Sequence, residues 1–295
     1  MAFTNLMTSK RAKFWMKKVL WRHIVGLIVT SFSIFPLVWM ISAAFDVTGQ
    51  LSTQQLIPVH AGFDNFTTLF SNAEKPFLVW ARNSIVIAVT ASIMQTVIGA
   101  VAAYSLSRHR FRGRKLTLST ILIAQMFPQL LAATTLFLII NNLGQTFPFL
   151  GLGHQLPLIL LFGGTALGVN TWMLKSFFDT IPSEIDEAAT IDGAGHFQIF
   201  VSIIIPLAIP VFVVIFLLSF IGILNEYLIT SVILGLDGNK MTVAVGLQQF
   251  IYGNYGKNWG PFTAGALIAT IPVLTLFMVL QKYLVSGLVS GSTKG

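Results

Sequence analysis

The acidic residues of this 295-residue chain are unevenly placed, and their grouping is the first feature with chemical potential. Five of the ten fall in one short window: Asp179, Glu184, Asp186, Glu187 and Asp192. Clustered carboxylates serve as metal ligands or as general acids and bases when histidines or other ligands stand beside them. The five histidines are scattered, and neither an H-E-x-x-H motif nor a Ser-His-acid grouping is present. The sequence therefore predicts no catalytic residues and no metal site.

The same window lies between two long apolar segments, so its charges belong outside the hydrocarbon of a membrane. We interpret residues 182–210 as a polar excursion at the membrane surface. Ser183 is a candidate N-cap for a short helix. Glu184, Asp186 and Glu187 then follow at the positive end of the helix dipole, where negative charge is stabilising.

Small side chains dominate one face of this predicted helix. Ile185, Ala188, Ala189 and Asp192 are spaced i, i+3, i+4 and i+7, which places them on one side. Gly193 follows and allows a sharp turn. Such a helix suits docking into a groove on another protein, and an ordinary amphipathic loop at the interface is the alternative. A second short helix is expected next, with one apolar side formed by Phe197, Phe200, Val201 and Ile204.

The window also carries a recognisable motif. Glu187-Ala188-Ala189-x-x-x-Gly193, nine residues and then Ile203-x-Ile205-Pro206 resembles the EAA motif of ABC-importer permeases, with Ile205 where that family usually has Leu. In that family the motif forms the coupling helix, which docks into a cleft of the ATPase subunit. The resemblance extends over nearly the whole chain and is strongest to the smaller permease of maltose/maltodextrin importers. It implies ATPase coupling by Glu187, Ala188, Ala189, Asp192, Gly193, Ile203 and Pro206.

The composition indicates the kind of fold that holds this acidic window in place. Hydrophobic residues make up 55% of the chain and charged residues 9%, whereas soluble domains carry about 25% charged residues. With no Cys, disulfides, thiolate metal sites and a Cys nucleophile are excluded. We predict an all-α membrane protein with six transmembrane helices and a cytoplasmic coupling helix, the type I ABC-importer permease fold. The spans are predicted at 24–45, 84–106, 116–140, 156–174, 207–234 and 262–280.

Three regions follow from this assignment. Residues 1–23 form an N-terminal segment, residues 24–281 the permease domain with its coupling helix at 182–206, and residues 282–295 a tail. Within the spans, Gln125 and Pro128 indicate a kink in the third, and Pro272 indicates one in the sixth. Close helix packing is expected at Gly163, Gly164 and Gly168.

The charge distribution predicts the orientation. Most of the 18 Lys and Arg residues fall at 10–22, in the loop at 108–115 and in the tail, all on one side of the predicted spans. The positive-inside rule places both termini and the excursion at 182–210 in the cytoplasm of a multi-pass cell-membrane protein. The net charge of +8 thus reflects topology and not a nucleic-acid partner. For the loop RHRFRGRK we favour topology and attraction to anionic membrane lipid over a specific ligand.

Two further stretches are candidate sites. Glu226, next to Asn225, is the one acid inside a predicted span, and the pair resembles a recurring stretch of sugar permeases. It is expected either beside the substrate path or as a structural acid near the outer boundary. Gln248, Gln249 and Tyr252 place amides beside an aromatic ring, which suits carbohydrate or protein contact. The resemblance implies contact with a solute-binding protein, and an aromatic belt at the membrane surface is the alternative.

The resemblance also implies an assembly. This chain would form a heterodimer with a homologous permease, and would bind an ATPase dimer and an extracytoplasmic sugar-binding protein. It would carry maltose or maltodextrin, with trehalose or a galacto-oligosaccharide as open alternatives. No G-x-x-x-x-G-K-[ST] stretch is present, so ATP and Mg²⁺ are expected on the ATPase and no cofactor on this chain. A membrane-embedded lipid enzyme is a remote alternative, because it needs paired acids or His at membrane depth or acids with a metal motif. A channel or secondary transporter is equally remote, because no ion-coupling charges and no internal repeat are found in the sequence.

Overall fold

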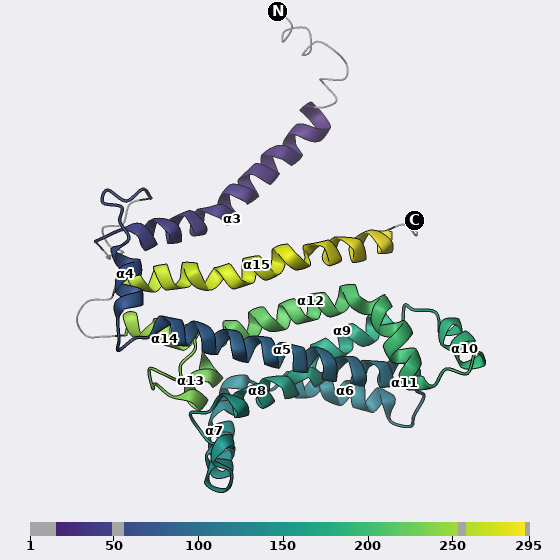
Figure 1. The fold of residues 1–295 in the computed structure, drawn as a ribbon. Coiled ribbons are helices and arrows are strands. Elements are labelled where there is room, and N and C mark those ends of the chain that lie inside the picture. The colour runs from purple at the N-terminus through teal and green to yellow at the C-terminus, as the bar shows by residue number, and fades with distance from the viewer. Residues whose placement is uncertain (1–15, 49–55, 253–257, 293–295) are drawn as a thin grey trace, which may run out of the picture.

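The computed structural model describes residues 16–48, 56–252 and 258–292. These residues are helical, with loops and one isolated bridge between Asp46 and Ala61 (Figure 1), which confirms the all-α prediction. The first half contains η1 (Met16–Leu20), α3 (Trp21–Phe45), α4 (Asp64–Ser71), α5 (Phe77–Arg108), α6 (Arg114–Gln125), α7 (Gln129–Thr146), η3 (Pro148–Leu150), α8 (Gln155–Gly164) and η4 (Thr165–Leu167). The second half contains α9 (Val169–Phe178), α10 (Ser183–Ile191), α11 (His196–Ile199), η5 (Phe200–Ile204), α12 (Ile205–Leu224), α13 (Leu228–Leu234), α14 (Val243–Gly246), η6 (Leu247–Phe250) and α15 (Trp259–Ser292).

Four helical stretches in the described residues are long and apolar enough to cross a membrane: Lys18–Phe45, Phe77–Arg108, His196–Leu224 and Trp259–Tyr283. The pair Gln155–Leu167 and Val169–Phe178, bent by 43°, makes a fifth if it is one span. The protein is therefore a multi-pass membrane protein, and the count of six spans stays a prediction.

The third predicted span is not one continuous helix. α6 ends at Gln125 and α7 begins at Gln129, on the far side of Pro128. Proline lacks a backbone N–H, and its ring disfavours helical backbone at the residue before it, so the helix stops at this point. α7 then turns away from the axis of α5 and protrudes from the rest of the molecule (Figure 1). With 12 residues, α6 is too short to cross a bilayer alone.

α5 is the central helix, and it packs against α8, α9 and α12. Its inward positions carry small residues, of which Ala88, Ala91 and Ala103 are fully buried, so neighbouring helices approach closely. Gly163 of α8 packs directly on Met94, where any side chain would collide, and this confirms the predicted close packing there. Gly164 has open space beside it, so the same prediction is wrong for that residue.

Near the N-terminal end of α5, three long-range hydrogen bonds hold the segment that leads into α14. The Trp80 indole donates to the Gly238 carbonyl at 2.7 Å, and the Asn83 amide donates to the Met241 carbonyl at 2.9 Å. The Ser84 hydroxyl accepts the backbone N–H of Val243 at 2.8 Å. These bonds fix a loop about 160 residues away along the chain to the start of α5.

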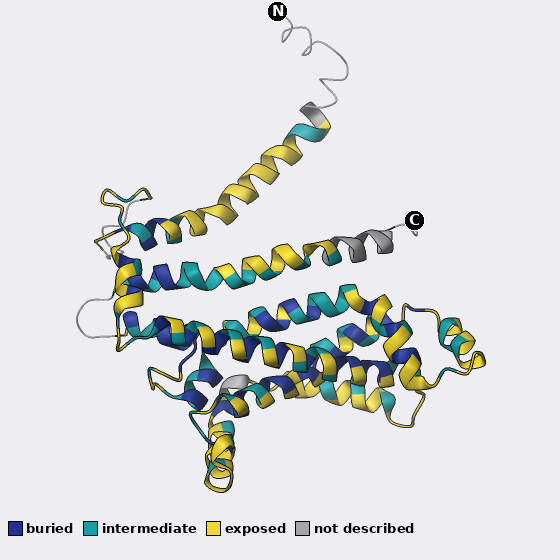
Figure 2. Ribbon diagram, viewed as in Figure 1, coloured by how far each residue is buried: buried dark blue, intermediate teal, exposed yellow. Residues whose placement is uncertain are grey.

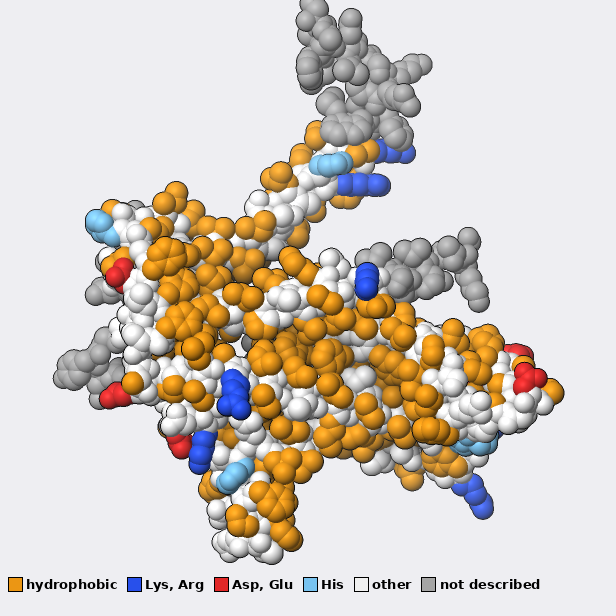
Figure 3. All heavy atoms as spheres, viewed as in Figure 1, with side chains coloured by type: hydrophobic (Ala, Val, Ile, Leu, Met, Phe, Trp, Pro, Cys, Tyr) orange, Lys and Arg blue, Asp and Glu red, His pale blue; other side chains and the backbone are white. Residues whose placement is uncertain are grey.

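α3 contrasts with this packed core. None of the most apolar window of α3 is buried, and Figure 2 shows α3 exposed along most of its length. Orange side chains cover much of the face in Figure 3, which is the expected surface of a protein solvated by lipid.

α15 runs on to Ser292, so the tail predicted to begin at 282 starts as a continuation of this helix.

Candidate coupling helix and polar cavity

α10 lies at one end of the molecule, beyond the long helices (Figure 1). Glu184 and Asp186 occupy its first turn, as predicted from the helix dipole. The predicted cap is wrong, because Pro182 occupies the cap position and Ser183 is already the first helical residue. Proline fixes a backbone angle suited to entering a helix, so no capping side chain is used here. Gly193 has φ +86°, the left-handed conformation that its predicted turn requires.

The predicted smooth face of α10 is divided between two environments. Ile185 and Ala189 are half-buried and pack against the chain's own core around Phe178 and Ile199. Ala188 and Asp192 of the same predicted face are exposed. The large apolar side chains that face outward are instead Ile191, 86% exposed, and Phe197, 79% exposed. Ile191 and Phe197 lie on either side of the Gly193 turn.

The second helix of the excursion is continuous with the next span, from His196 to Leu224. A π-helical turn, η5, covers Phe200–Ile204, and Pro206 follows after Ile205. In a regular α-helix the ring of Pro206 would collide with the carbonyl of residue 202, and the wider turn relieves this clash. The predicted apolar side is also wrong in part. Phe200 and Ile204 are buried, whereas Phe197 and Val201 are exposed.

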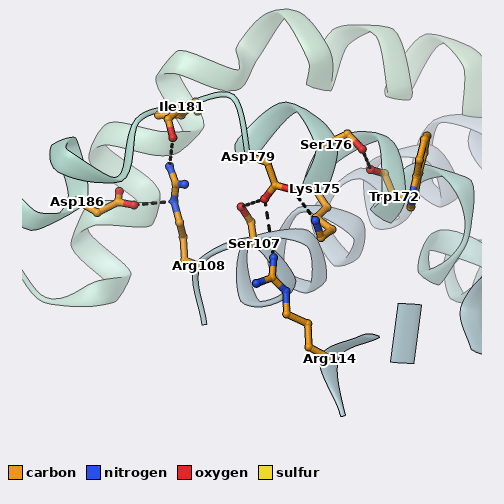
Figure 4. A network of polar contacts seen from close by, with 9 residues as sticks. All are labelled: Ser107, Arg108, Arg114, Trp172, Lys175, Ser176, Asp179, Ile181 and Asp186. Carbon is orange, nitrogen blue, oxygen red and sulfur yellow. Dashed lines mark hydrogen bonds and ion pairs between the residues drawn. The ribbon is translucent and has the colours of Figure 1, made fainter. Parts of the chain in front are cut away.

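An ion pair joins α10 to the end of α5. The Arg108 Nε lies 2.6 Å from the Asp186 carboxylate, and the two side chains are only 14% and 17% exposed. The same guanidinium donates to the Ile181 carbonyl at 3.0 Å (Figure 4). When one partner of a pair this sheltered from water is removed, the remaining charge is uncompensated and the folded protein is strongly destabilised. Arg108 therefore ties the first turn of α10 to the end of α5.

Asp179 forms a second polar centre between α5, α6 and α9. It accepts a hydrogen bond from the Ser107 hydroxyl at 2.6 Å and pairs with Lys175, and Arg114 lies 4.0 Å away (Figure 4). Partial burial raises the pKa of Asp179, but the hydrogen bonds from Lys175 and Ser107 and the nearby charges outweigh it, so the pKa is lowered. We call the whole set the α10 junction: Ser107, Arg108, Arg114, Lys175, Asp179 and Asp186.

Between the spans, neutral polar groups from α5, η4, α9 and α12 meet. The Gln95 amide donates to the Phe162 carbonyl and to the Thr165 hydroxyl, both at 2.8 Å. Asn170 donates to the Gln95 carbonyl oxygen and to the Ser219 hydroxyl, both at 3.0 Å. We call Gln95, Thr165, Asn170 and Ser219 the polar cluster. Sequence analysis missed it, although isolated amides inside apolar spans were a usable signal.

The polar cluster lines a cavity of about 610 Å³, which we call the polar cavity. A second cavity of about 640 Å³ lies along α6. Gln125 and Thr165 line both, so they stand between the two spaces. Gln125 packs directly on Gly168, where a side chain would collide with it, and this confirms the close packing predicted at Gly168.

The predicted pair Asn225 and Glu226 sits where α12 ends. The Glu226 carboxylate accepts the backbone N–H groups of Ile229 and Thr230, each at 2.8 Å, and the Thr230 hydroxyl at 2.7 Å. It therefore satisfies the start of α13, a structural role. Glu226 also lines the polar cavity, whereas exposed Asn225 bonds back to Ile221. The position of Glu226 on the cavity wall is compatible with the predicted place beside the substrate path, which stays a prediction.

The third predicted site falls on η6 and the residues after it. Gln248 and Gln249 are half-buried, and the Gln249 carbonyl accepts Lys75 Nζ at 3.0 Å. Tyr252 is exposed. The neighbouring residues 253–257 lie outside the described residues. Across the described part of the chain, His, Asp and Glu form no group of three or more suited to a metal ion.

Lipid-facing helices around a polar cavity, with a charged helix beyond their ends, define a membrane transport protein. The family described as "Binding-protein-dependent transport system inner membrane component" matches residues 95–290. This chain belongs to that family, so it is a transport permease and not an enzyme.

Relatives and a solved structure agree with this assignment. The maltose/maltodextrin transport system permease protein MalG of Vibrio vulnificus (strain YJ016) is 37% identical, covering 92% of this chain and 95% of its own. The maltodextrin permease MdxG of Bacillus subtilis (strain 168) is 40% identical, covering 89% and 91%. The galactooligosaccharides permease GanQ of that strain is 36% identical, covering 89% and 90%. A chain of a bacterial ABC transporter that imports alginate shares the fold, with TM-score 0.74 and 22% identity over 93% and 98% of the two chains.

Proposed function

We propose that this chain is the permease subunit of an ATP-driven sugar importer and that α10 is its ATPase-coupling helix. The observation that carries the proposal is the construction of α10. It is held from within by the Arg108–Asp186 pair and ends at the Gly193 turn, with Ile191 exposed before the turn and Phe197 of α11 exposed after it. A helix fixed on one side, with Glu184, Glu187 and Ile191 exposed on the other, can transmit a partner's movement to α5 and α12.

The two cavities support a substrate path. The polar cluster offers amide and hydroxyl groups, which match the hydroxyls of a sugar. Gln125 and Thr165 separate the two spaces, so an opening between them would have to move the contact of Gln125 with Gly168. Glu226 lies on the same cavity wall. Alternating exposure of the two spaces would carry the sugar without any covalent chemistry.

Maltose or a maltodextrin is the proposed substrate, supported by relatives named for that transport at 37% and 40% identity. A galacto-oligosaccharide is the second candidate, because GanQ is similar at 36% identity. The proposed partners are a homologous permease, an ATPase dimer that binds ATP and Mg²⁺, and a sugar-binding protein contacting Gln248, Gln249 and Tyr252. A structurally similar alginate ABC transporter was solved in complex with an alginate-bound periplasmic protein, which supports a partner of that kind. With the ATPase at α10, both termini would lie in the cytoplasm.

The deciding experiment is ATP hydrolysis by the reconstituted complex, with candidate binding proteins and a panel of maltodextrins, trehalose and galactosides. We expect maltodextrins to stimulate hydrolysis at least several-fold and the other sugars to have little effect. Stimulation by a galactoside alone would replace the substrate and leave the coupling proposal in place. An assembled complex that no sugar stimulates would contradict the sugar assignment.

A further inference from the structure

The loop between α5 and α6 has an unusual concentration of cations: Arg108, Arg110, Arg112, Arg114 and Lys115. Two of them have carboxylate partners in the chain. Arg108 lies 2.6 Å from Asp186, and Arg114 lies 4.0 Å from Asp179. Both are half-buried. These two arginines hold the loop against the α10 junction and do not account for the rest of its charge.

The other three cations have no such role. Arg110, Arg112 and Lys115 are exposed, and across the described residues none of them makes an ion pair or hydrogen bond. Three uncompensated positive charges within six residues repel one another, and they attract a surface of high negative charge density.

The surroundings of these cations indicate what that surface is. Phe111, 43% exposed, stands between the two arginines, and Leu116, 71% exposed, follows Lys115. Gly113, with φ +97°, reverses the chain so that α6 begins directly after the end of a 32-residue apolar span. Cations and apolar side chains are thus mixed in the short loop where a membrane helix reaches the surface. That combination fits the boundary between headgroups and acyl chains.

We propose that Arg110, Arg112 and Lys115 bind the headgroup phosphates of anionic phospholipids, with Phe111 and Leu116 in the adjoining acyl region. An acidic protein surface would neutralise the cations but would leave these two apolar side chains without a matching environment. The same loop carries Arg108 and Arg114, so bound lipid would also steady the α10 junction. This inference goes beyond transport and does not require the coupling role of α10.

The direct test is lipid binding to the purified full-length chain in zwitterionic micelles, counted by native mass spectrometry during titration with phosphatidylglycerol. The variant is Arg110→Gln/Arg112→Gln. One cation near an anionic surface contributes about 1 kcal/mol, so losing two should weaken binding by roughly 30-fold. Raising the salt concentration should weaken binding to the unaltered chain, because the contact is electrostatic.

A matched control removes the same charge elsewhere. Arg82 is exposed and makes no ion pair within the described residues, and Lys240 makes only a solvent-exposed contact with Asp237 at 3.7 Å. Arg82→Gln/Lys240→Gln should retain phosphatidylglycerol binding within about 3-fold. Equal losses in both variants, or no loss in either, would overturn the proposal. Equal competition by soluble glycerol phosphate would also overturn it, because the loop would then bind any free phosphate. If these cations bound an acidic partner protein and not phosphatidylglycerol, the proposal would be wrong and that protein would be the occupant.

Discussion

The α10 junction and the polar cluster both join helices through polar side chains, but they use different groups. The junction relies on charges, with Arg108 on Asp186 and Lys175 on Asp179. The polar cluster relies on neutral groups, with Gln95 and Asn170 at its centre. Charge is tolerated where water reaches the end of the spans, and it is costly between them. The depth of each region thus decides which chemistry holds it.

The largest expected effect is at the turn after α10, where backbone geometry alone separates two glycines. Gly193 has φ +86° and Gly195 has φ −75°, and neither has an atom within 4 Å of an added Cβ. Gly193→Val should therefore abolish sugar uptake, because a β-branched residue is a steric outlier at this left-handed backbone and the turn after α10 would be lost. Uptake and membrane content are measured together in cells.

The control for that prediction is Gly195→Val, which should keep most of the uptake because its backbone suits a β-branched residue. Normal transport by Gly193→Val would contradict the requirement for this turn. Equal loss in both variants would indicate that space around α10, and not its backbone, is limiting.

The next effect concerns the sheltered ion pair. Arg108→Gln should reduce coupled uptake by about 10- to 100-fold, since removing one partner leaves Asp186 uncompensated at a cost of about 3 kcal/mol. The double variant Arg108→Gln/Asp186→Asn should recover part of the loss, measured as a double-mutant cycle on uptake.

The exposed pair of Lys240 and Asp237 provides the comparison, with side chains 47% and 52% exposed. Lys240→Gln should change uptake by less than about 2-fold. If Arg108→Gln were equally mild, burial of the junction would not be what makes its charges matter.

The smallest effect is expected in the polar cluster. Asn170→Ala removes two neutral hydrogen bonds, each worth about 0.6 kcal/mol on average between helices in membranes. The thermal unfolding temperature of the detergent-solubilised protein should fall by a few degrees, about the same at low and high salt. A loss that depends strongly on salt would remove the distinction between the two regions.

Local features of α10 and the turn after it could be predicted from sequence. Glu184 and Asp186 in a first turn, followed by a glycine with positive φ, depend only on neighbours along the chain. The exposed face of α10 could not, because the burial of Ile185 depends on Phe178 and Ile199 folding over it.

The polar cluster illustrates the harder case. Gln95 and Asn170 are 75 residues apart in the chain, and no local pattern pairs them. The break at Pro128 was predicted only as a kink, since whether a proline bends or ends a helix depends on what fills the freed space. Here Gln125 turns onto Gly168 at that point.

The exposure of α3 has a consequence for assembly thermodynamics. Its most apolar window has no buried residue, yet in a bilayer such a surface is already solvated by hydrocarbon. Covering it with another helix exchanges one apolar neighbour for another and releases almost no hydrophobic free energy. The insertion of α3 and its association with any neighbour are therefore separate equilibria. The first is set by the transfer of its apolar side chains from water to hydrocarbon, and the second by van der Waals fit and lipid entropy.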